Sequence, residues 1–280
     1  MHDFPERSLT PQEARDGLGR GAWVDVRDDA AFAAGHLPGC ASLPLRAWAE
    51  RRHEWPPPEA DVVVVGATAE DAREAGARLT ASGYASVAWV DAPWDALGVP
   101  PVRGPAERHW RPAAFLEEAI VGLPRGRALD LACGTGRDAV FLALAGFEVE
   151  AWDHDAPALE RAGDLARRHG VSIRTVLADL ETAEPPALEA GAFALVVCFR
   201  YLHRPLFSML ERSVAPGGHL VYETFREGQE RFGRPLRPRF LLRAGELRAA
   251  FPSLEVLRYE EPSPVGGPWT ARLLARRPGA

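Results

Sequence analysis

The stretch Asp130-Leu131-Ala132-Cys133-Gly134-Thr135-Gly136 decides the fold of the larger part of this chain. It follows residues 127–129, which are typical of the start of a buried strand, and it precedes residues 137–143, whose pattern predicts a helix. A strand, a glycine turn and a helix N-terminus in this order bring backbone N–H groups to a bound ligand. We therefore expect a ligand site at this turn.

A second predicted strand ends in Asp153, about twenty residues after the turn, where an acidic side chain can accept hydrogen bonds from both hydroxyls of a ribose. A dinucleotide and S-adenosylmethionine both fit this arrangement. The turn has Ala132 where the dinucleotide motif begins with glycine. Asp130 would repel a pyrophosphate but attract the ammonium group of S-adenosylmethionine. The sequence therefore favours S-adenosylmethionine, and a nicotinamide-dependent oxidoreductase is the disfavoured alternative.

The composition bounds the remaining classes of function. The 280 residues are enough for two ordinary domains, and no run approaches the ~20 apolar residues that span a bilayer. The N-terminus lacks the pattern of a secretory signal, so we expect a cytoplasmic protein. The net charge of −6 argues against general nucleic-acid binding. Cys40, Cys133 and Cys198 are far apart, which favours reduced thiols and predicts no metal site.

Prolines and glycines concentrate in residues 98–105, which predicts a boundary between a domain at 1–103 and a domain at 104–280. The first domain reads as a small α/β domain, with strands over 22–26, 61–65 and 86–90 and a helix over 69–82. The four consecutive valines of the second strand indicate burial on both faces.

Three motifs in residues 8–101 resemble the rhodanese family: Trp23-Val24-Asp25-Val26-Arg27, residues 32–39 and residues 94–100. Rhodaneses carry a persulfide on a cysteine directly after the central strand, where this chain has Gly66. Cys40 falls in a different part of the pattern. We therefore expect a catalytically inactive domain that serves regulation or contact with a protein partner, and sulfur transfer is the disfavoured alternative.

The second domain alternates strands and helices. Strands are predicted at 127–132, 147–152, 172–177, 193–198 and 218–224, and helices at 112–121, 137–145, 156–169, 204–214 and 243–250. Two further strands, at 254–260 and 269–275, have no helix between them, which predicts an antiparallel pair. The fold class is therefore α/β, with a doubly wound, Rossmann-like sheet whose last strand is antiparallel. Ligands of such sheets bind at the carboxyl ends of the strands.

Residues 106–280 resemble the class I S-adenosylmethionine-dependent methyltransferases, and the turn with residues 137–139 and 146–153 resembles the tellurite-resistance-type group most. The resemblance implies that Asp130 faces the methionine end of the cofactor, that Asp153 holds the ribose and that Asp179 accepts from the adenine amine. The implied cofactor-binding residues are Asp130, Ala132, Cys133, Gly134, Thr135, Gly136, Asp153, His154, Asp179, Leu180 and Phe199.

The residues that choose the methyl acceptor are expected after the fourth and fifth strands. Tyr201, His203 and Glu223 are candidates to orient or deprotonate the acceptor. A core-facing ring for Tyr201 and a helix N-terminus for His203 are the structural alternatives. The Asn/Asp-Pro-Pro-aromatic motif of enzymes that methylate exocyclic base amines is absent after the fourth strand, which disfavours that chemistry.

Residues 226–248 contain seven arginines against three glutamates and have no helical period, so we expect a long loop. Arg234 and Arg239, together with Arg200, are candidates to bind an anionic small-molecule acceptor through bidentate contacts. A solvated basic loop is the alternative. The leading interpretation is a methyltransferase with a non-catalytic rhodanese-like domain. The second is a non-catalytic protein that senses the cofactor or binds partners.

Overall fold

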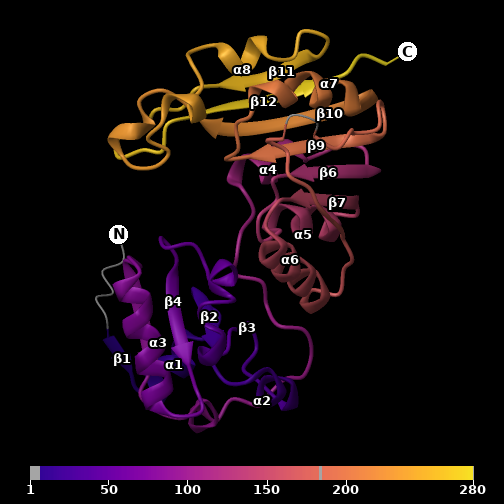
Figure 1. The fold of residues 1–280 in the computed structure, drawn as a ribbon. Coiled ribbons are helices and arrows are strands. Elements are labelled where there is room, and N and C mark those ends of the chain that lie inside the picture. Colours follow the sequence, from indigo (N-terminus) through magenta and orange to yellow (C-terminus); the bar gives the residue numbers. More distant parts are fainter. Residues whose placement is uncertain (1–6, 183–184, 280) are drawn as a thin grey trace. The chain divides into compact units, whose positions relative to one another are not determined.

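The computed structural model describes residues 7–182 and 185–279, and the chain divides into two compact units, Met1–Arg111 and Pro112–Ala280 (Figure 1). The division falls after Arg111 rather than after residue 103. The backbone N–H of Glu107 donates to the carbonyl of Cys40 at 2.9 Å, and His109 Nε2 lies 3.1 Å from the carbonyl oxygen of Gly39. These contacts attach the connecting segment to the first unit.

The first unit is a five-stranded parallel sheet in the order β1-β5-β4-β2-β3. Its strands are β1 (Arg7–Leu9), β2 (Ala22–Asp25), β3 (Cys40–Ser42), β4 (Asp61–Val65) and β5 (Ser86–Val90). Its helices are α1 (Pro11–Gly17), α2 (Asp29–Ala34) and α3 (Ala69–Ala81). Short 3-10 turns span Leu45–Ala47, Arg52–Glu54 and Trp94–Leu97.

The valines of β4 are shared between two hydrophobic cores, as predicted for a strand buried on both faces. Val62 and Val64 pack with Leu79 of α3, whereas Val65 packs in the core that contains Phe32 of α2. The predicted strands correspond to β2, β4 and β5, and the predicted helix corresponds to α3. β1 and β3 were not predicted, because strands of three residues are too short to display a period.

The second unit is a seven-stranded sheet in the order β11-β12-β10-β9-β6-β7-β8. Its strands are β6 (Arg127–Leu131), β7 (Glu148–Asp153), β8 (Arg174–Leu177), β9 (Phe193–Phe199), β10 (Val214–Phe225), β11 (Glu255–Glu260) and β12 (Thr270–Arg276). Its α-helices are α4 (Ala114–Ala119), α5 (Arg137–Leu144), α6 (Ala156–Arg168), α7 (Phe207–Ser213) and α8 (Glu246–Ala249). β12 runs antiparallel to both β10 and β11, which confirms the predicted antiparallel last strand.

β6 lies in the interior of the sheet, and its side chains point alternately into the two cores on either side of it. Leu129 and Leu131 enter the core that α7 and α8 cover, and Ala128 enters the core that α4 and α5 cover. Because β6 lies between β9 and β7, its carboxyl end meets those of both neighbours. The residues that follow these three strands therefore converge on one edge.

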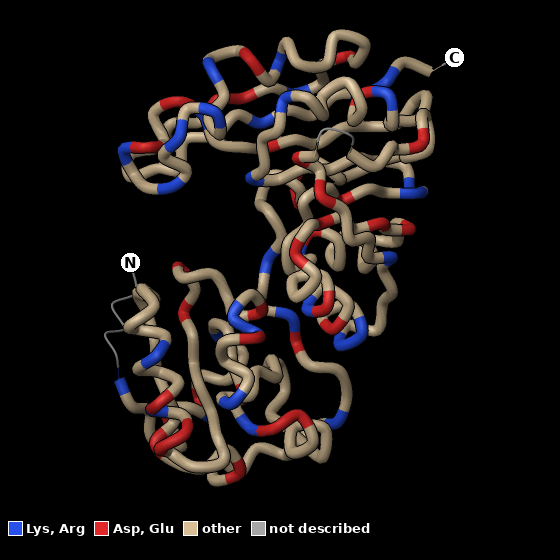
Figure 2. The backbone as a smooth tube through the Cα atoms, viewed as in Figure 1, with Lys and Arg blue, Asp and Glu red and all other residues tan. Residues whose placement is uncertain are grey.

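Several element boundaries differ from the prediction, among them those of β10 and of the last helix. β10 begins at Val214 rather than 218, and its pairing with β9 shifts register between Val214 and His219, around a proline and two glycines. The last helix is only Glu246–Ala249, so the preceding loop is correspondingly long. That loop, from 226 to 245, contains two short 3-10 turns, Gln229–Arg231 and Pro238–Phe240, and Figure 2 shows basic residues along it. Among the described helices, none is both long and apolar enough to cross a membrane.

Candidate functional site

Hydrogen bonds to the end of β7 fix the position of the turn after β6. The N–H of Cys133 donates to the carbonyl of Trp152 at 3.0 Å, and the N–H of Gly134 donates to Asp153 Oδ2 at 2.8 Å. The other oxygen of Asp153 accepts from the N–H of Asp155 at 3.0 Å. The buried Asp153 carboxylate thus joins the turn to the start of α6, besides its predicted role toward a ribose.

Two glycines of the turn serve different purposes. Both have a left-handed backbone, with φ of +54° at Gly134 and +78° at Gly136. A Cβ on Gly136 would come within 2.4 Å of Ala162 Cβ on α6, so this glycine permits close helix packing. A Cβ on Gly134 would meet nothing within 4 Å, so the space over this residue is open to a ligand.

Asp130 is a buried carboxylate at the end of β6, with 2% of its surface exposed. Its Oδ2 has no hydrogen-bond partner among the residues that the structure describes. Burial, together with the charges of Asp138 and Asp153, raises the pKa of Asp130 well above the ordinary value. A buried, unpartnered acceptor of this kind is unfavourable until a donor reaches it.

A cavity of about 550 Å³ lies at the carboxyl ends of the central strands, and we call it the turn cavity. Its lining includes the predicted cofactor residues Ala132, Asp153, His154, Asp179, Leu180 and Phe199. Ala178 and Glu181, which were not predicted, also line it. The remaining predicted residues lie outside the lining of this cavity, at the end of β6 or in the adjoining turn: Asp130, Cys133, Gly134, Thr135 and Gly136.

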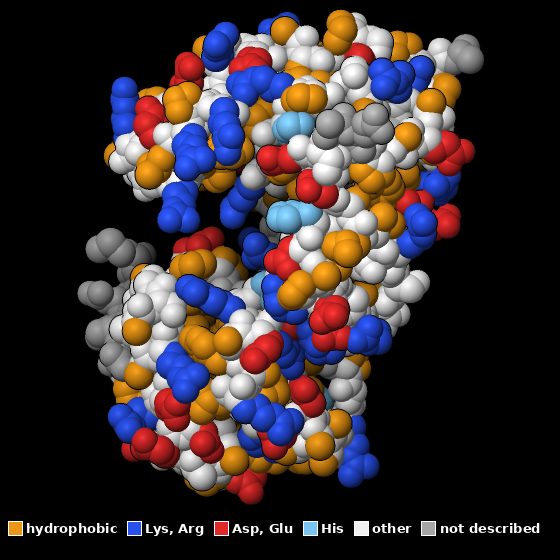
Figure 3. All heavy atoms as spheres, viewed as in Figure 1, with side chains coloured by type: hydrophobic (Ala, Val, Ile, Leu, Met, Phe, Trp, Pro, Cys, Tyr) orange, Lys and Arg blue, Asp and Glu red, His pale blue; other side chains and the backbone are white. Residues whose placement is uncertain are grey.

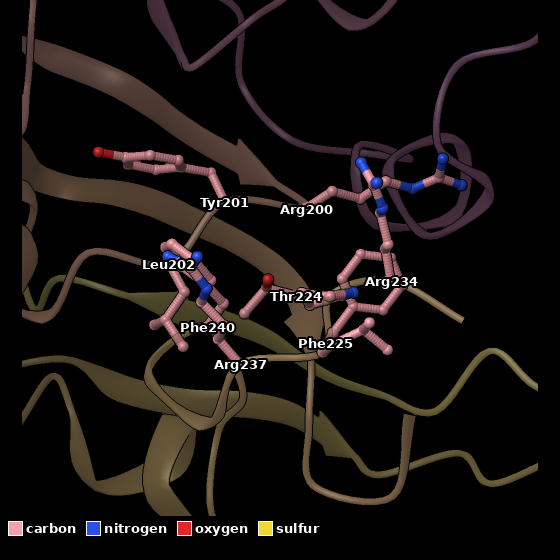
Figure 4. A pocket seen from close by; sticks show the side chains of 10 residues that line it. Arg200, Tyr201, Leu202, Thr224, Phe225, Arg234, Arg237 and Phe240 are labelled. Carbon is pink, nitrogen blue, oxygen red and sulfur yellow. The ribbon is translucent and has the colours of Figure 1, made fainter. Parts of the chain in front are cut away.

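A second cavity, of about 660 Å³, lies beside the loop after β10, and we call it the loop cavity (Figure 4). Arg200 and Tyr201 line both cavities, so the two meet at these residues. The rest of its lining comes from Leu202, from β10 and from the loop: Thr224, Phe225, Arg234, Pro235, Leu236, Arg237 and Phe240. A ligand in each cavity would therefore face the other across Arg200 and Tyr201.

Arg200 holds a left-handed backbone, with φ of +56°, which costs a residue with a side chain about 1–2 kcal/mol. Its N–H donates to the carbonyl of Glu223 on β10 at 2.8 Å, which fixes the bend at the end of β9. Non-glycine residues in this conformation concentrate at functional sites. The bend carries the side chain of Arg200 to the boundary of the two cavities.

Tyr201 places its hydroxyl in a buried position without a hydrogen-bond partner among the described residues. Burial, followed by the charge of Glu181, raises the pKa of the Tyr201 phenol far above its ordinary value. The phenol is therefore protonated at neutral pH, and it can donate a hydrogen bond to a ligand. This chemistry supports the predicted orienting role of Tyr201 and opposes a role as a base.

Of the residues predicted to act on the methyl acceptor, three lie outside the lining of both cavities. His203 precedes the 3-10 turn Arg204–Leu206. Glu223 is 3.2 Å from Arg272 Nε on β12, in an ion pair within the sheet. The guanidinium of Arg239 lies 4.5 Å from the centre of the Phe240 ring, and its carbonyl accepts a hydrogen bond from Arg204.

Arg237 lines the loop cavity but was not among the predicted site residues, although the basic loop that contains it was predicted. The apolar lining residues Leu202, Phe225, Leu236 and Phe240 were not predicted either. The only available signal was the alternation of arginine, proline and aromatic residues over 232–240. Such a segment has no period that tells which side chains face inward.

Comparison with known proteins matches each unit to a family. Residues 10–97 match the rhodanese-like domain, which confirms the resemblance predicted for the first domain. Residues 113–266 match the family described as "Tellurite resistance protein TehB".

Individual relatives cover only part of the chain. Hemagglutinin 1 of Eikenella corrodens is 30% identical over 52% of this chain and 49% of its own length. The "Probable S-adenosyl-L-methionine-dependent methyltransferase TehB" of Haemophilus influenzae is 26% identical over 48% of each chain. The chain thus spans about half the length of these curated relatives. The crystal structure of TehB from Haemophilus influenzae aligns with a TM-score of 0.49 at 21% identity, over 58% of this chain and 61% of that one.

The match over residues 113–266 covers more than half of the 280 residues. It also spans the glycine turn, both cavities and the arginine-rich loop described above. The chain therefore belongs to the TehB family of tellurite resistance proteins, with a rhodanese-like domain at its N-terminal side.

Proposed function

We propose that the second unit transfers a methyl group from S-adenosylmethionine to an anionic small-molecule acceptor. The observation that carries this proposal is the meeting of the turn cavity and the loop cavity at Arg200 and Tyr201. A donor in the first cavity and an acceptor in the second would be adjacent there. Positioning two reactants in this way is worth about 7–11 kcal/mol of the barrier.

The residues of the turn fit the donor. The unpartnered Oδ2 of Asp130 is suited to accept from the ammonium group at the methionine end. The open space over Gly134 leaves room for the ligand beside the backbone. Asp179 is exposed at the rim of the turn cavity and is available to an adenine amine, as the family resemblance implies.

The donor, when bound, supplies a methyl group that its sulfonium makes electrophilic. The protein then has to exclude water, align the acceptor and stabilise its charge. Arg200 stands at the junction with a guanidinium, and Tyr201 offers a neutral O–H donor. A general base is needed only for an acceptor that is protonated at neutral pH.

The proposal is tested by incubating the protein with S-adenosylmethionine labelled in the methyl group and a small-molecule fraction of a bacterial extract. We expect label to enter a low-mass anionic product, separable by anion exchange. The Gly134→Asp variant serves as the control, and it should transfer no label. Binding of the donor without transfer in any extract would support the cofactor-sensing alternative instead.

We infer that the first unit does not transfer sulfur. Gly66 stands directly after β4, and a Cβ there would lie 3.0 Å from Asp71 Cβ. Thr68 and Asp71 form a capping box at the start of α3, which directs a carboxylate to the loop that would hold an anionic sulfur donor. Cys40 is buried, and burial raises the pKa of its thiol, so it is a poor nucleophile. Contact with a partner protein is the remaining role that we propose for this unit.

The full chain is accordingly expected to form no thiocyanate from thiosulfate and cyanide. A known rhodanese run in parallel checks the assay, and binding of S-adenosylmethionine by the same preparation checks that the protein is folded. Thiocyanate formation that persists in a Cys40→Ala variant would point to another sulfur-carrying residue. Formation that disappears in that variant would identify Cys40 as the nucleophile, and either result contradicts the inference.

A further inference from the structure

The arginines that line the loop cavity are not held in ion pairs within the part of the chain that the structure describes. Arg204 of the same unit, for comparison, is bound by both oxygens of Glu246, at 2.5 and 2.9 Å. By contrast, the guanidinium groups of Arg200, Arg234 and Arg237 have no ion pair or hydrogen bond with any residue that the structure describes. Figure 3 shows basic side chains gathered on the surface of this region.

These three arginines come from two separate elements and line one cavity. Arg200 follows β9, and Arg234 and Arg237 belong to the loop after β10. In Figure 4 the side chains of Arg200 and Arg234 extend to the same side of the cavity, and the ring of Tyr201 extends away from them. Unpaired guanidinium groups that share a cavity favour an anion, which they bind through bidentate hydrogen bonds.

The remainder of the lining is apolar. Leu202, Phe225 and Phe240 contribute hydrocarbon and aromatic surface. Leu236 belongs to the same lining, although 63% of its surface is exposed. Exposed apolar side chains beside a polar anchor are typical of a surface that a ligand covers.

The loop cavity is larger than a bare inorganic oxyanion would fill. Its volume of about 660 Å³ lies within the range of about 300–1,000 Å³ that is usual for sites of organic ligands. An ion of a few atoms would contact the arginines and leave the apolar lining exposed to water. An organic anion would satisfy both parts of the lining.

We propose that the acceptor is an amphipathic organic anion, whose charged group is bound by the arginines and whose hydrocarbon part covers Leu236 and Phe240. This inference rests on the proposed function, because it assigns the loop cavity to the acceptor. Arg234 and Arg237 line only the loop cavity, whereas Arg200 also lines the turn cavity. The first two therefore bind the part of the acceptor remote from the donor.

The test uses the full chain saturated with S-adenosylhomocysteine, the demethylated product of the donor, and measures binding of four probes by calorimetry. Octanoate has both the charge and the hydrocarbon part, acetate has only the charge, octan-1-ol has only the hydrocarbon part, and selenite is a bare oxyanion. We expect octanoate to bind at least tenfold more tightly than each of the other three.

Variants test the contributions of the arginines and of the apolar lining separately. The double variant Arg234→Gln with Arg237→Gln should lose at least tenfold in affinity for octanoate, and Phe240→Ala should weaken octanoate but not acetate. Arg248→Gln is the matched control, because Arg248 is an exposed arginine of α8 outside the cavity lining, and it should bind as the wild type does. Arg234 and Arg237 are both exposed, so their replacement leaves the core intact.

Selenite binding as tightly as octanoate would overturn the inference, and so would unchanged octanoate affinity in the double variant. Binding of S-adenosylhomocysteine is measured first. Its failure would overturn the proposed function, and the inference with it. Normal binding of this product without any preference for octanoate would overturn the inference alone.

Discussion

Replacing Gly134 with aspartate is expected to abolish binding of S-adenosylmethionine, with a loss of at least a hundredfold in affinity. A side chain at this position would enter the open space over the turn, where nothing of the protein lies within 4 Å. Its carboxylate would join the buried acids Asp130 and Asp153 and compete with them for any cation. The φ of +54° adds about 1–2 kcal/mol of backbone strain for any residue with a Cβ.

The Gly170→Asp variant is the control for the backbone strain that aspartate would cause at a position with positive φ. Gly170 has a φ of +68° and also has nothing within 4 Å of an added Cβ. It follows the far end of α6, a helix of 13 residues and therefore about 20 Å long. Calorimetry should show normal cofactor binding for this variant and none for Gly134→Asp. Equal binding by both variants would refute the assignment of the turn as the cofactor site.

Replacing Asp130 with asparagine is expected to have two opposite effects. The free protein should become more stable by about 1–3 kcal/mol at neutral pH, because a neutral amide replaces an acid whose charged form is disfavoured by burial and by the charges of Asp138 and Asp153. The affinity for S-adenosylmethionine should fall about ten- to a hundredfold, because the charged acceptor for its ammonium group is lost. Thermal unfolding and calorimetry measure the two quantities separately.

The control for this variant is Asp155→Asn. Asp155 caps α6 by accepting from the N–H of Ala158, and asparagine caps a helix about as well as aspartate. Neither stability nor cofactor affinity should change by more than a few tenths of a kcal/mol. An Asp130→Asn protein that binds the cofactor like the wild type would contradict the role given to Asp130.

The pH dependence follows from the raised pKa of Asp130. The native state holds this proton more tightly than the unfolded chain, in which the pKa returns to about 3.8. The contribution of Asp130 to the free energy of unfolding is therefore full below about pH 3.8, and it is lost as pH rises through the native pKa. Cofactor affinity should rise over the same interval, because the carboxylate must be deprotonated to attract the ammonium. The contribution of Asp130 to both slopes should be absent in Asp130→Asn, so that both slopes are shallower than in the wild type.

The sequence alone determined the order of elements in the second unit and the position of the turn. Both depend on local features, namely the short apolar runs of β6 and β9 and the turn glycines at 134 and 136, where the backbone is left-handed. The sequence also showed that no cysteine follows β4, because only the residue directly after that strand has to be known. The acids at or just after the ends of β6, β7 and β8 could also be expected to share one edge, because carboxyl ends of parallel strands meet there.

Only the tertiary structure decided which arginines of the loop share a cavity and that Arg200 and Tyr201 join it to the turn cavity. The loop has no period, so the inward direction of Arg237 and the outward direction of Arg239 depend on contacts made after folding. The second task of Asp153, as acceptor for the N–H of Gly134, is also a contact between residues far apart in sequence. Local patterns specify what each segment forms, whereas contacts across the sheet specify which side chains meet.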